Sequence, residues 1–233
     1  MVIVILVICI AAILAVVLKK ITVSAALAGG VIALTIYYSV GFIGLVELAA
    51  FFLLGTFTTG FKMKEKNQLN ISEENIGTRS FGQVFANCGA AFLLSIFFLI
   101  FTFDKQLICI MIAGSFAAAI ADTLSSELGN IYGRKFYCIL NFRKSQKGLN
   151  GVVSLEGTLI GFSGSCLIGG VHMLASLQSR DFIIIVIAGT IGNLVDSILG
   201  ATLENSNIFN NNQVNFINTI SGAVAAGLLY SLL

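Results

Sequence analysis

The sequence predicts an all-α, polytopic membrane protein in which a single domain, residues 1–233, forms a bundle of about eight transmembrane helices. Three observations support this fold class. Hydrophobic residues make up 57% of the chain and charged residues only 10%, whereas a soluble domain carries about 25% charged residues. The mean hydropathy is +0.98. Apolar runs of about 20 residues, the length that crosses a bilayer, recur between polar breaks.

Eight apolar runs follow one another along the chain. The first is followed by Lys19 and Lys20, whereas a signal peptide carries its basic residues before the apolar core, so we expect a retained span. The second is diluted by Ser, Thr and Gly, and the later runs alternate with polar stretches at 61–82, 130–153 and 204–213. We place the spans at 1–18, 21–39, 41–60, 83–102, 106–129, 155–177, 182–201 and 214–233.

The basic residues predict the orientation of this bundle. If the first span runs from outside to inside, eleven of the thirteen Lys and Arg residues fall on one side, and the other side keeps Lys105 and Arg180. The positive-inside rule assigns the richer side to the cytoplasm. We therefore expect a protein of the cell's inner or plasma membrane with both termini outside. The eleven residues are Lys19, Lys20, Lys62, Lys64, Lys66, Arg79, Arg134, Lys135, Arg143, Lys144 and Lys147.

Two motifs place carboxylates inside membrane-length apolar segments: ADTLSSELG at 121–129 in the fifth span, and GNLVDSILGATLE at 192–204 in the seventh. An ionised side chain in hydrocarbon costs at least ~2.5–3.5 kcal/mol, so such residues usually face a cavity, a partner or a metal ion. On an ideal helix, Asp122 shares one stripe with Ser126 and Gly129. The matching stripe in the seventh span contains Asn193, Asp196, Ser197 and Gly200.

These stripes predict a magnesium site. Mg²⁺ is held by a few carboxylates together with waters and substrate phosphates, and Asp122 and Asp196 could supply two of them. Glu127 is a further candidate ligand, although it faces elsewhere unless the helix breaks near Gly129. Alternatively, the acids only hydrogen-bond between helices or pair with lysines. Several polar residues fall near the predicted cytoplasmic ends of their spans, so we expect the site to open there: Asp122, Glu127, Glu156, Asp196, Asn87, Asn193 and Asn215.

The loop KGLNGVVSLEGT, at 147–158, opens the sixth span and is rich in glycine. Ser154 is a candidate N-cap, and a helix N-terminus presents free N–H groups suited to phosphate. Lys147, Asn150 and Gly151 would complete such a cradle. A plain turn is the alternative.

The segment from Gly60 to Gly89 carries Lys62, Lys64 and Arg79. These residues are candidates for phosphate binding, but basic residues at a membrane surface often only fix topology or meet anionic lipid. His172 is the only histidine, and no carboxylate lies near it in sequence. We expect it to be packed or to face lipid. Glu47 lies in the outer half of the third span, and the sequence assigns it no role.

The ordered motifs ADTLSSELG, GLNGVVSLEGT, GNLVDSILGATLE and NNQVNFINTISGA, preceded by RSFGQVFANCG, cover nearly the whole chain. In this order they resemble the integral membrane family that includes transmembrane protein 19 and the chloroplast phytyl-phosphate kinase. More distantly, the chain is similar to CTP-dependent dolichol and phytol kinases and to membrane cytidylyltransferases.

The resemblance implies phosphorylation of an isoprenoid monophosphate, phytyl or prenyl, to its diphosphate by a nucleoside triphosphate such as CTP, with Mg²⁺. The implied partners are the bilayer, the lipid phosphate and the nucleotide, with no nucleic acid; whether the chain forms a homo-oligomer is left open. The implied catalytic residues are Asp122, Asp196, Lys62 and Arg79, and the metal ligands Asp122, Glu127 and Asp196. The implied nucleotide-binding residues are Lys64, Asn87, Lys147, Asn150, Gly151, Ser154, Glu156, Asn193, Ser197 and Asn215.

Two alternatives belong to other functional classes. Intramembrane carboxylates also mark ion and substrate pathways, which would make the chain a transporter or lipid flippase. Transporter sites usually lie near the midplane, however, and these acids cluster at one face. A non-catalytic membrane protein would leave the shared location of the polar residues unexplained.

Overall fold

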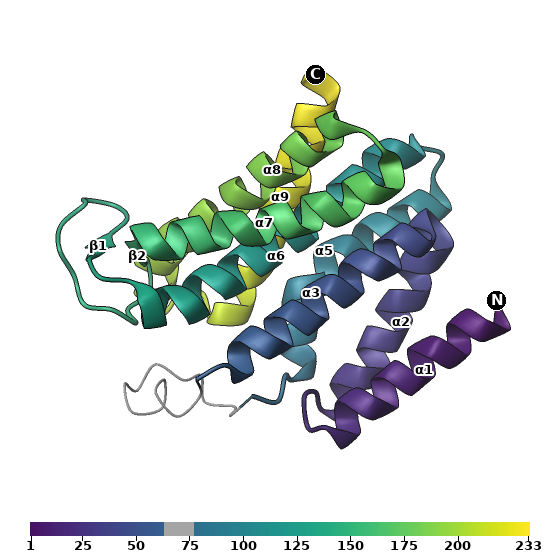
Figure 1. The fold of residues 1–233 in the computed structure, drawn as a ribbon, viewed down its shortest axis with the longest axis horizontal. Helices are drawn as coiled ribbons and strands as arrows, with labels where there is room; N and C mark the ends of the chain where they lie inside the picture. Colours follow the sequence, from purple (N-terminus) through teal and green to yellow (C-terminus); the bar gives the residue numbers. More distant parts are fainter. Residues whose placement is uncertain (63–76) are drawn as a thin grey trace.

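A computed structural model describes residues 1–62 and 77–233 and shows a bundle of long helices with one small hairpin (Figure 1). The helices are α1 (Val2–Val17), α2 (Val23–Val40), α3 (Phe42–Gly60), α5 (Phe81–Ile100), α6 (Lys105–Tyr132), α7 (Leu155–Ser176), α8 (Ser179–Leu199) and α9 (Asn211–Leu232). Strands β1 (Phe136–Cys138) and β2 (Val152–Ser154) pair antiparallel, with Tyr137 opposite Val153. A π-helical turn, Gly200–Glu204, continues α8.

The predicted fold class is confirmed. Seven of the described helices, α2, α3 and α5–α9, are long and apolar enough to cross a membrane. The first expected span differs, because α1 has 16 residues and is therefore only about 24 Å long at 1.5 Å per residue, against about 30 Å of hydrocarbon. The fifth span is longer than predicted, since α6 runs over 28 residues to Tyr132.

Side-chain caps and glycine set the helix ends in this chain, which contains no proline. Ser80 and Gln83 form a reciprocal capping box at the start of α5. Asn210 and Gln213 form the same arrangement at the start of α9. Each box satisfies two backbone N–H groups that a helix start would otherwise leave unpaired. Between α2 and α3 the backbone reverses at Gly41, whose φ of +85° is unfavourable for other residues.

Helix α6 is the centre of the bundle. It packs against α7, α8 and α9 on one side and against α3 and α5 on the other, while α1 lies at the periphery beside α2 (Figure 1). Small residues bring these backbones close together: a Cβ added at Gly114 would lie 2.8 Å from the carbonyl oxygen of Gly222. Such contacts are typical of membrane helix packing. Large side chains such as Phe116, Ile168 and Ile185 fill the middle of the bundle and are fully buried.

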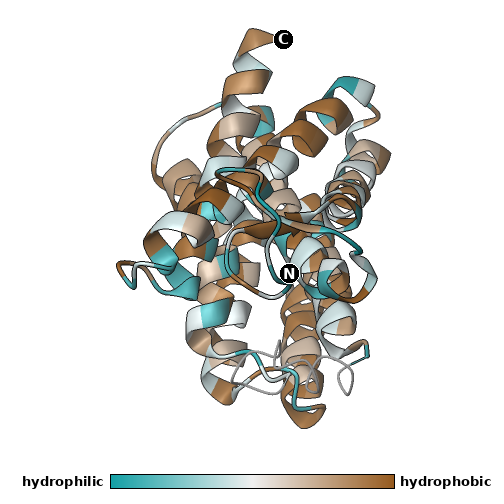
Figure 2. Cartoon of the chain, turned by 90° about the vertical axis from the view of Figure 1, so that its left-hand side faces the viewer, coloured by the Kyte–Doolittle hydropathy of each residue, from teal (hydrophilic) through white to brown (hydrophobic). Residues whose placement is uncertain are grey.

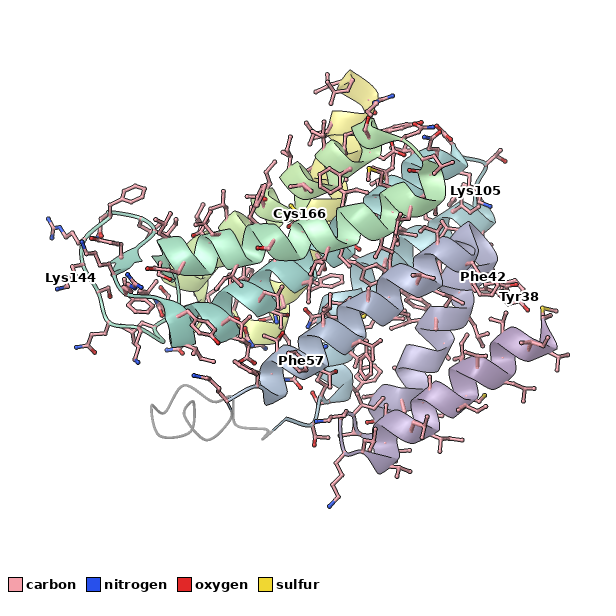
Figure 3. All side chains as sticks on the ribbon, in the orientation of Figure 1. Tyr38, Phe42, Phe57, Lys105, Lys144 and Cys166 are labelled. Carbon is pink, nitrogen blue, oxygen red and sulfur yellow. The ribbon has the colours of Figure 1, made fainter. Side chains whose placement is uncertain are left out.

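The two ends of the bundle are distinguished by their connections. The β1–β2 hairpin marks one, which we call the hairpin end, and the α5–α6 and α7–α8 connections mark the opposite end; Figure 3 labels Lys144 at the first and Lys105 at the second. Seen from the hairpin end, hydrophilic segments gather around the hairpin, while the helices are mainly hydrophobic (Figure 2). The cytoplasmic location of this end and the outside location of the termini stay predictions.

Candidate functional site

A cavity of about 440 Å³ lies at the hairpin end, between α5, α6, α7, α8, α9 and the loop that precedes β2. Eleven of the fifteen site residues predicted from the sequence line it, and they come from α5 and the segment before it, α6, the loop and strand before α7, α8 and α9. They are Arg79, Asn87, Asp122, Glu127, Asn150, Gly151, Ser154, Asn193, Asp196, Ser197 and Asn215. The fold therefore gathers most of the predicted polar residues into one space.

Two aspartates meet in this cavity. Asp122 from α6 lies within hydrogen-bonding range of the Asp196 carboxyl on α8. Asp196 Oδ1 is buried and has no hydrogen-bond partner among the described residues. Two carboxyl groups in contact are compatible only with a shared proton or a cation between them, because like charges at that distance repel.

Glycines in the motifs allow this approach. A Cβ at Gly129 would lie 2.8 Å from the Cα of Gly157, so α6 and α7 cross in near contact at this point. One turn deeper, Gly161 leaves room for the Asn193 side chain, whose Oδ1 accepts a hydrogen bond of 3.0 Å from Ser125 Oγ. Helices α6, α7 and α8 are thus held together directly beside the acids.

The glycine-rich loop packs against the π-helical turn. Gly151 has a φ of +72°, and its Cα faces Ala201 with no space for a side chain. Asn205 Nδ2 donates a hydrogen bond of 3.2 Å to the Asn150 carbonyl. Ser154 is the N-cap of α7, as predicted, and its Oγ accepts a hydrogen bond of 3.0 Å from Gly157 N–H. That hydroxyl therefore stabilises the helix start.

Arg79 is the one basic residue among the described lining residues of the cavity. Its main chain is fixed by the α1–α2 linker: Arg79 N–H donates to the Lys20 carbonyl, and Thr22 N–H donates to the Arg79 carbonyl. Its guanidinium lies over the Phe51 ring, 5.4 Å from the ring centroid, and against Gly55 of α3. The main chain of this lining cation is thus fixed by hydrogen bonds, and its guanidinium packs on α3.

The other predicted cations do not line this cavity. Lys62 lies over the ring of Tyr132, 5.7 Å from its centroid, and Lys147 is exposed on the loop and outside the lining. Glu156 is also outside the lining, and it accepts a hydrogen bond from Arg134 N–H at 3.4 Å. Lys64 lies outside the described residues. Gly148 and Gly151, which lie on either side of Asn150, both have positive φ in this loop.

In the part of the chain that the structure describes, no three His, Cys, Asp or Glu side chains gather closely enough to hold a metal ion. Of the predicted ligand set, Asp122 and Asp196 lie together, whereas Glu127 lines the same cavity about 140° around α6 from Asp122. Its place among the ligands stays a prediction. A pair of carboxylates still fits magnesium, which completes its shell with waters and phosphate oxygens. The buried Oδ1 atoms of Asp196 and Asn87, without partners among the described residues, are oxygen donors of the kind Mg²⁺ prefers.

Comparison with known sequences places these features in a family. The family model "Integral membrane protein DUF92" matches residues 6–223. The chain belongs to the DUF92 family.

Several relatives resemble this chain over most of its length. It is 34% identical to Protein VTE6, chloroplastic, of Arabidopsis thaliana over 197 residues, which are 81% of this chain and 59% of that protein. It is 36% identical to an uncharacterized membrane protein of Methanocaldococcus jannaschii, covering 84% of this chain and 80% of that one. An uncharacterized membrane protein of Synechocystis is 31% identical over 84% of this chain. No solved structure matches the chain.

The structure of this DUF92 protein adds site residues that sequence reasoning missed. Glu204, on the π-helical turn, lines the cavity and acts electrostatically on Asp196. It ends the second acidic motif, so the motif itself was the available signal. Asn218 on α9 is fully buried beside the Asp196 carboxyl. With Asn211 and Asn215 it forms a stripe at spacings of four and three residues, which a helical pattern could have revealed.

Proposed function

We propose that this DUF92 protein transfers the terminal phosphoryl group of a nucleoside triphosphate, with CTP as the first candidate, to an isoprenoid monophosphate. The observation that carries the proposal is the contact between Asp122 and Asp196 inside a polar cavity of a membrane bundle. The relationship to Protein VTE6, a phytyl-phosphate kinase, supports a prenyl-phosphate acceptor. Because this chain spans 59% of that protein, the acceptor belongs to the proposal.

The chemistry requires positioning and charge neutralisation more than covalent help from the protein. The bond between the γ-phosphorus and the β,γ-bridging oxygen breaks, which releases the nucleoside diphosphate, and a new P–O bond forms to an oxygen of the acceptor phosphate. The acceptor is already an anion, so no strong general base is required. This agrees with the position of the only histidine, His172, outside the cavity lining.

Five cavity residues have a part in this proposal. Asp122 and Asp196 would hold Mg²⁺, which would neutralise the negative charge of the triphosphate oxygens. Arg79 binds a phosphate group from the α3–α5 side, opposite the acids. The amides of Asn87 and Asn215 orient the phosphates by hydrogen bonds. The isoprenoid tail stays in the hydrocarbon and the phosphates stay in the cavity at the hairpin end, on the cytoplasmic side.

The test is formation of diphosphate by the purified protein in lipid nanodiscs. Geranylgeranyl and phytyl monophosphates are each offered with CTP, ATP, GTP and UTP, with Mg²⁺ and with EDTA. We expect diphosphate only with Mg²⁺ and fastest with CTP. Thermal unfolding with the same nucleotides reports binding separately, since a ligand of the folded state raises its stability. A well-folded protein that forms no diphosphate with any pair would contradict the proposal and favour a transporter or flippase.

A further inference from the structure

Three ionisable side chains meet far from the cavity, at the opposite end of the bundle: Glu47 on α3, His172 on α7 and Asp181 on α8. Their residues are 1%, 3% and 0% exposed. His172 Nδ1 lies 2.7 Å from Glu47 Oε1, and His172 Nε2 lies 3.8 Å from Asp181 Oδ2. Each ring nitrogen of the histidine therefore faces a different carboxyl group. We call these three residues the Glu–His–Asp cluster.

This cluster is separate from the site described above. Asp181 and Asp196 share α8 but are 15 residues apart, which corresponds to about 22 Å along the helix axis. Between them α8 presents buried apolar residues, including Ile184, Ile185 and Ala188. The Glu–His–Asp cluster is thus a second polar region with its own environment.

The charges of the cluster do not balance without added protons. With both acids ionised and the ring neutral, the net charge is −2, and a proton on each of two groups brings it to zero. The short Nδ1–Oε1 contact requires one proton between Glu47 and His172. Neither oxygen of Asp181 has a hydrogen-bond partner among the described residues, although this residue is fully buried. A buried carboxylate without a partner is strongly unfavourable, whereas the protonated acid is tolerated.

Neighbouring groups supply no other counter-charge. His172 is the only basic residue among those described that lies within ion-pair distance of either acid. Arg180, the next residue to Asp181, instead donates to the Tyr230 carbonyl and lies over the Tyr230 ring on α9. On the α6 side the nearby titratable and charged groups are Cys109, Asp104 and Lys105. Of these, only Lys105 carries positive charge, and no ion pair joins it to the cluster.

We propose that the Glu–His–Asp cluster is a proton-binding site that holds two protons in the folded protein at neutral pH and thereby ties α3 to α7 and α8. Its ligand is the proton of the compartment at that end of the bundle. The unfolded chain, with solvated acids, binds fewer protons at the same pH. The stabilisation by the cluster is therefore present at lower pH and is lost as the pH rises, because stability falls with pH wherever the folded state binds more protons.

Infrared spectroscopy of the protein in nanodiscs tests the proton count directly. At neutral pH the wild-type protein should show the carbonyl absorption of a protonated, buried carboxylic acid. Asp181→Asn should remove that absorption, because Asp181 is the acid that holds its own proton, and Glu47→Gln should shift its frequency by altering the neighbouring contact. Asp196→Asn should leave it, which distinguishes the cluster from the aspartate pair of the cavity. Asp104→Asn, a change at an exposed acid of the same end, is the matched control. Absence of any absorption sensitive to either cluster variant would overturn the proposal.

Thermal unfolding as a function of pH is the second measurement. The wild-type melting temperature should fall between pH 6 and pH 9, and Asp181→Asn, which mimics the protonated acid, should flatten that decline while keeping stability at pH 6. An unaltered pH profile in both Asp181→Asn and Glu47→Gln would overturn the proposal. If Na⁺ or K⁺ stabilises the wild-type protein at fixed pH and these variants lose that stabilisation, the ligand of the cluster is a metal cation. That result would also overturn the proposal. Neither measurement depends on kinase activity.

Discussion

The buried acids at the two ends of this bundle have different partners. At the opposite end, Glu47 and Asp181 face the two nitrogens of a histidine supplied by the chain itself, and all three side chains are closed off. At the hairpin end, Asp122 and Asp196 lie within hydrogen-bonding range of each other in a cavity lined by amides, hydroxyls and glycines. The first pair of acids therefore has a partner within the chain, whereas under the proposed function the aspartate pair receives its counter-charge from a bound Mg²⁺. The source of the counter-charge, more than burial, separates the two roles.

His172→Gln should have the largest effect on stability, because it removes the histidine of the Glu–His–Asp cluster. Removing one partner of a buried charged group typically costs about 3–5 kcal/mol, because the remaining charges lose their compensation. We expect this loss in unfolding measurements, while turnover per folded molecule stays within about twofold, since distant sites act independently. Ser163→Ala, an exposed change on the same helix, is the control. An unchanged melting temperature would mean that the Glu–His–Asp cluster does not stabilise the fold.

Asp196→Asn tests the aspartate pair at the hairpin end. The amide keeps the volume and polarity of the side chain but removes a metal-binding charge, so turnover should fall about 100-fold or more, on the scale of losing a preorganised electrostatic group. The melting temperature without nucleotide should be retained or raised, because the repulsion with Asp122 disappears. Asp104→Asn serves again as the control, since Asn caps a helix as well as Asp. Full activity in Asp196→Asn would remove this aspartate from the mechanism.

Gly55→Ala sharpens the assignment of Arg79. A Cβ at this position would lie 2.5 Å from Arg79 Nη2, so the guanidinium must shift away from its place on Phe51. We expect the KM for the phosphate substrate to rise about tenfold, which corresponds to ~1.4 kcal/mol, with a smaller change in kcat. Gly170→Ala is the matched control, because nothing lies within 4 Å of an added Cβ there. Equal KM values for the two variants would show that the position of Arg79 is not critical.

Lys147→Ala should have the smallest effect. The sequence predicts a phosphate-binding role for this residue, but the structure places it outside the cavity lining. Exposed substitutions of this kind usually change stability by less than about 0.5 kcal/mol, and we expect a change of similar size in kcat/KM. A loss of tenfold or more in the same assay would mean that the loop closes over the cavity when substrate binds, which would restore the sequence-based prediction.

Local pattern gave reliable predictions where one helix was enough to decide the answer. The N-cap at Ser154 and the membrane-length runs follow from neighbouring residues, and the structure agrees with both. The ends of α1 and α6 differ from the predicted spans. Hydropathy identifies apolar residues but does not determine where the helix itself ends. The β1–β2 hairpin lies inside a stretch that the sequence presented only as polar.

Contacts between distant residues could not be predicted in the same way. Glu47 and His172 are 125 positions apart and belong to helices with no shared motif. The sequence therefore left Glu47 without a role and predicted a packed or lipid-facing His172. His172 is packed, as the first alternative predicted. Its partner Glu47 could not be predicted, because the contact depends on how α3 lies against α7. Asp122 and Asp196 were linked because their motifs are alike, a signal that the Glu–His–Asp cluster lacks.

The sequence by itself determined the solvent and hence the fold class: in a bilayer every backbone polar group must be paired internally, so a chain of this hydropathy forms membrane helices. It also determined which residues share a helix face, because the helical period is fixed. Only the tertiary structure decided which acids meet each other, which meet a histidine, and which lysines stay outside the cavity. Those outcomes depend on close contacts between glycines and small side chains of different helices, and no local pattern contains that information.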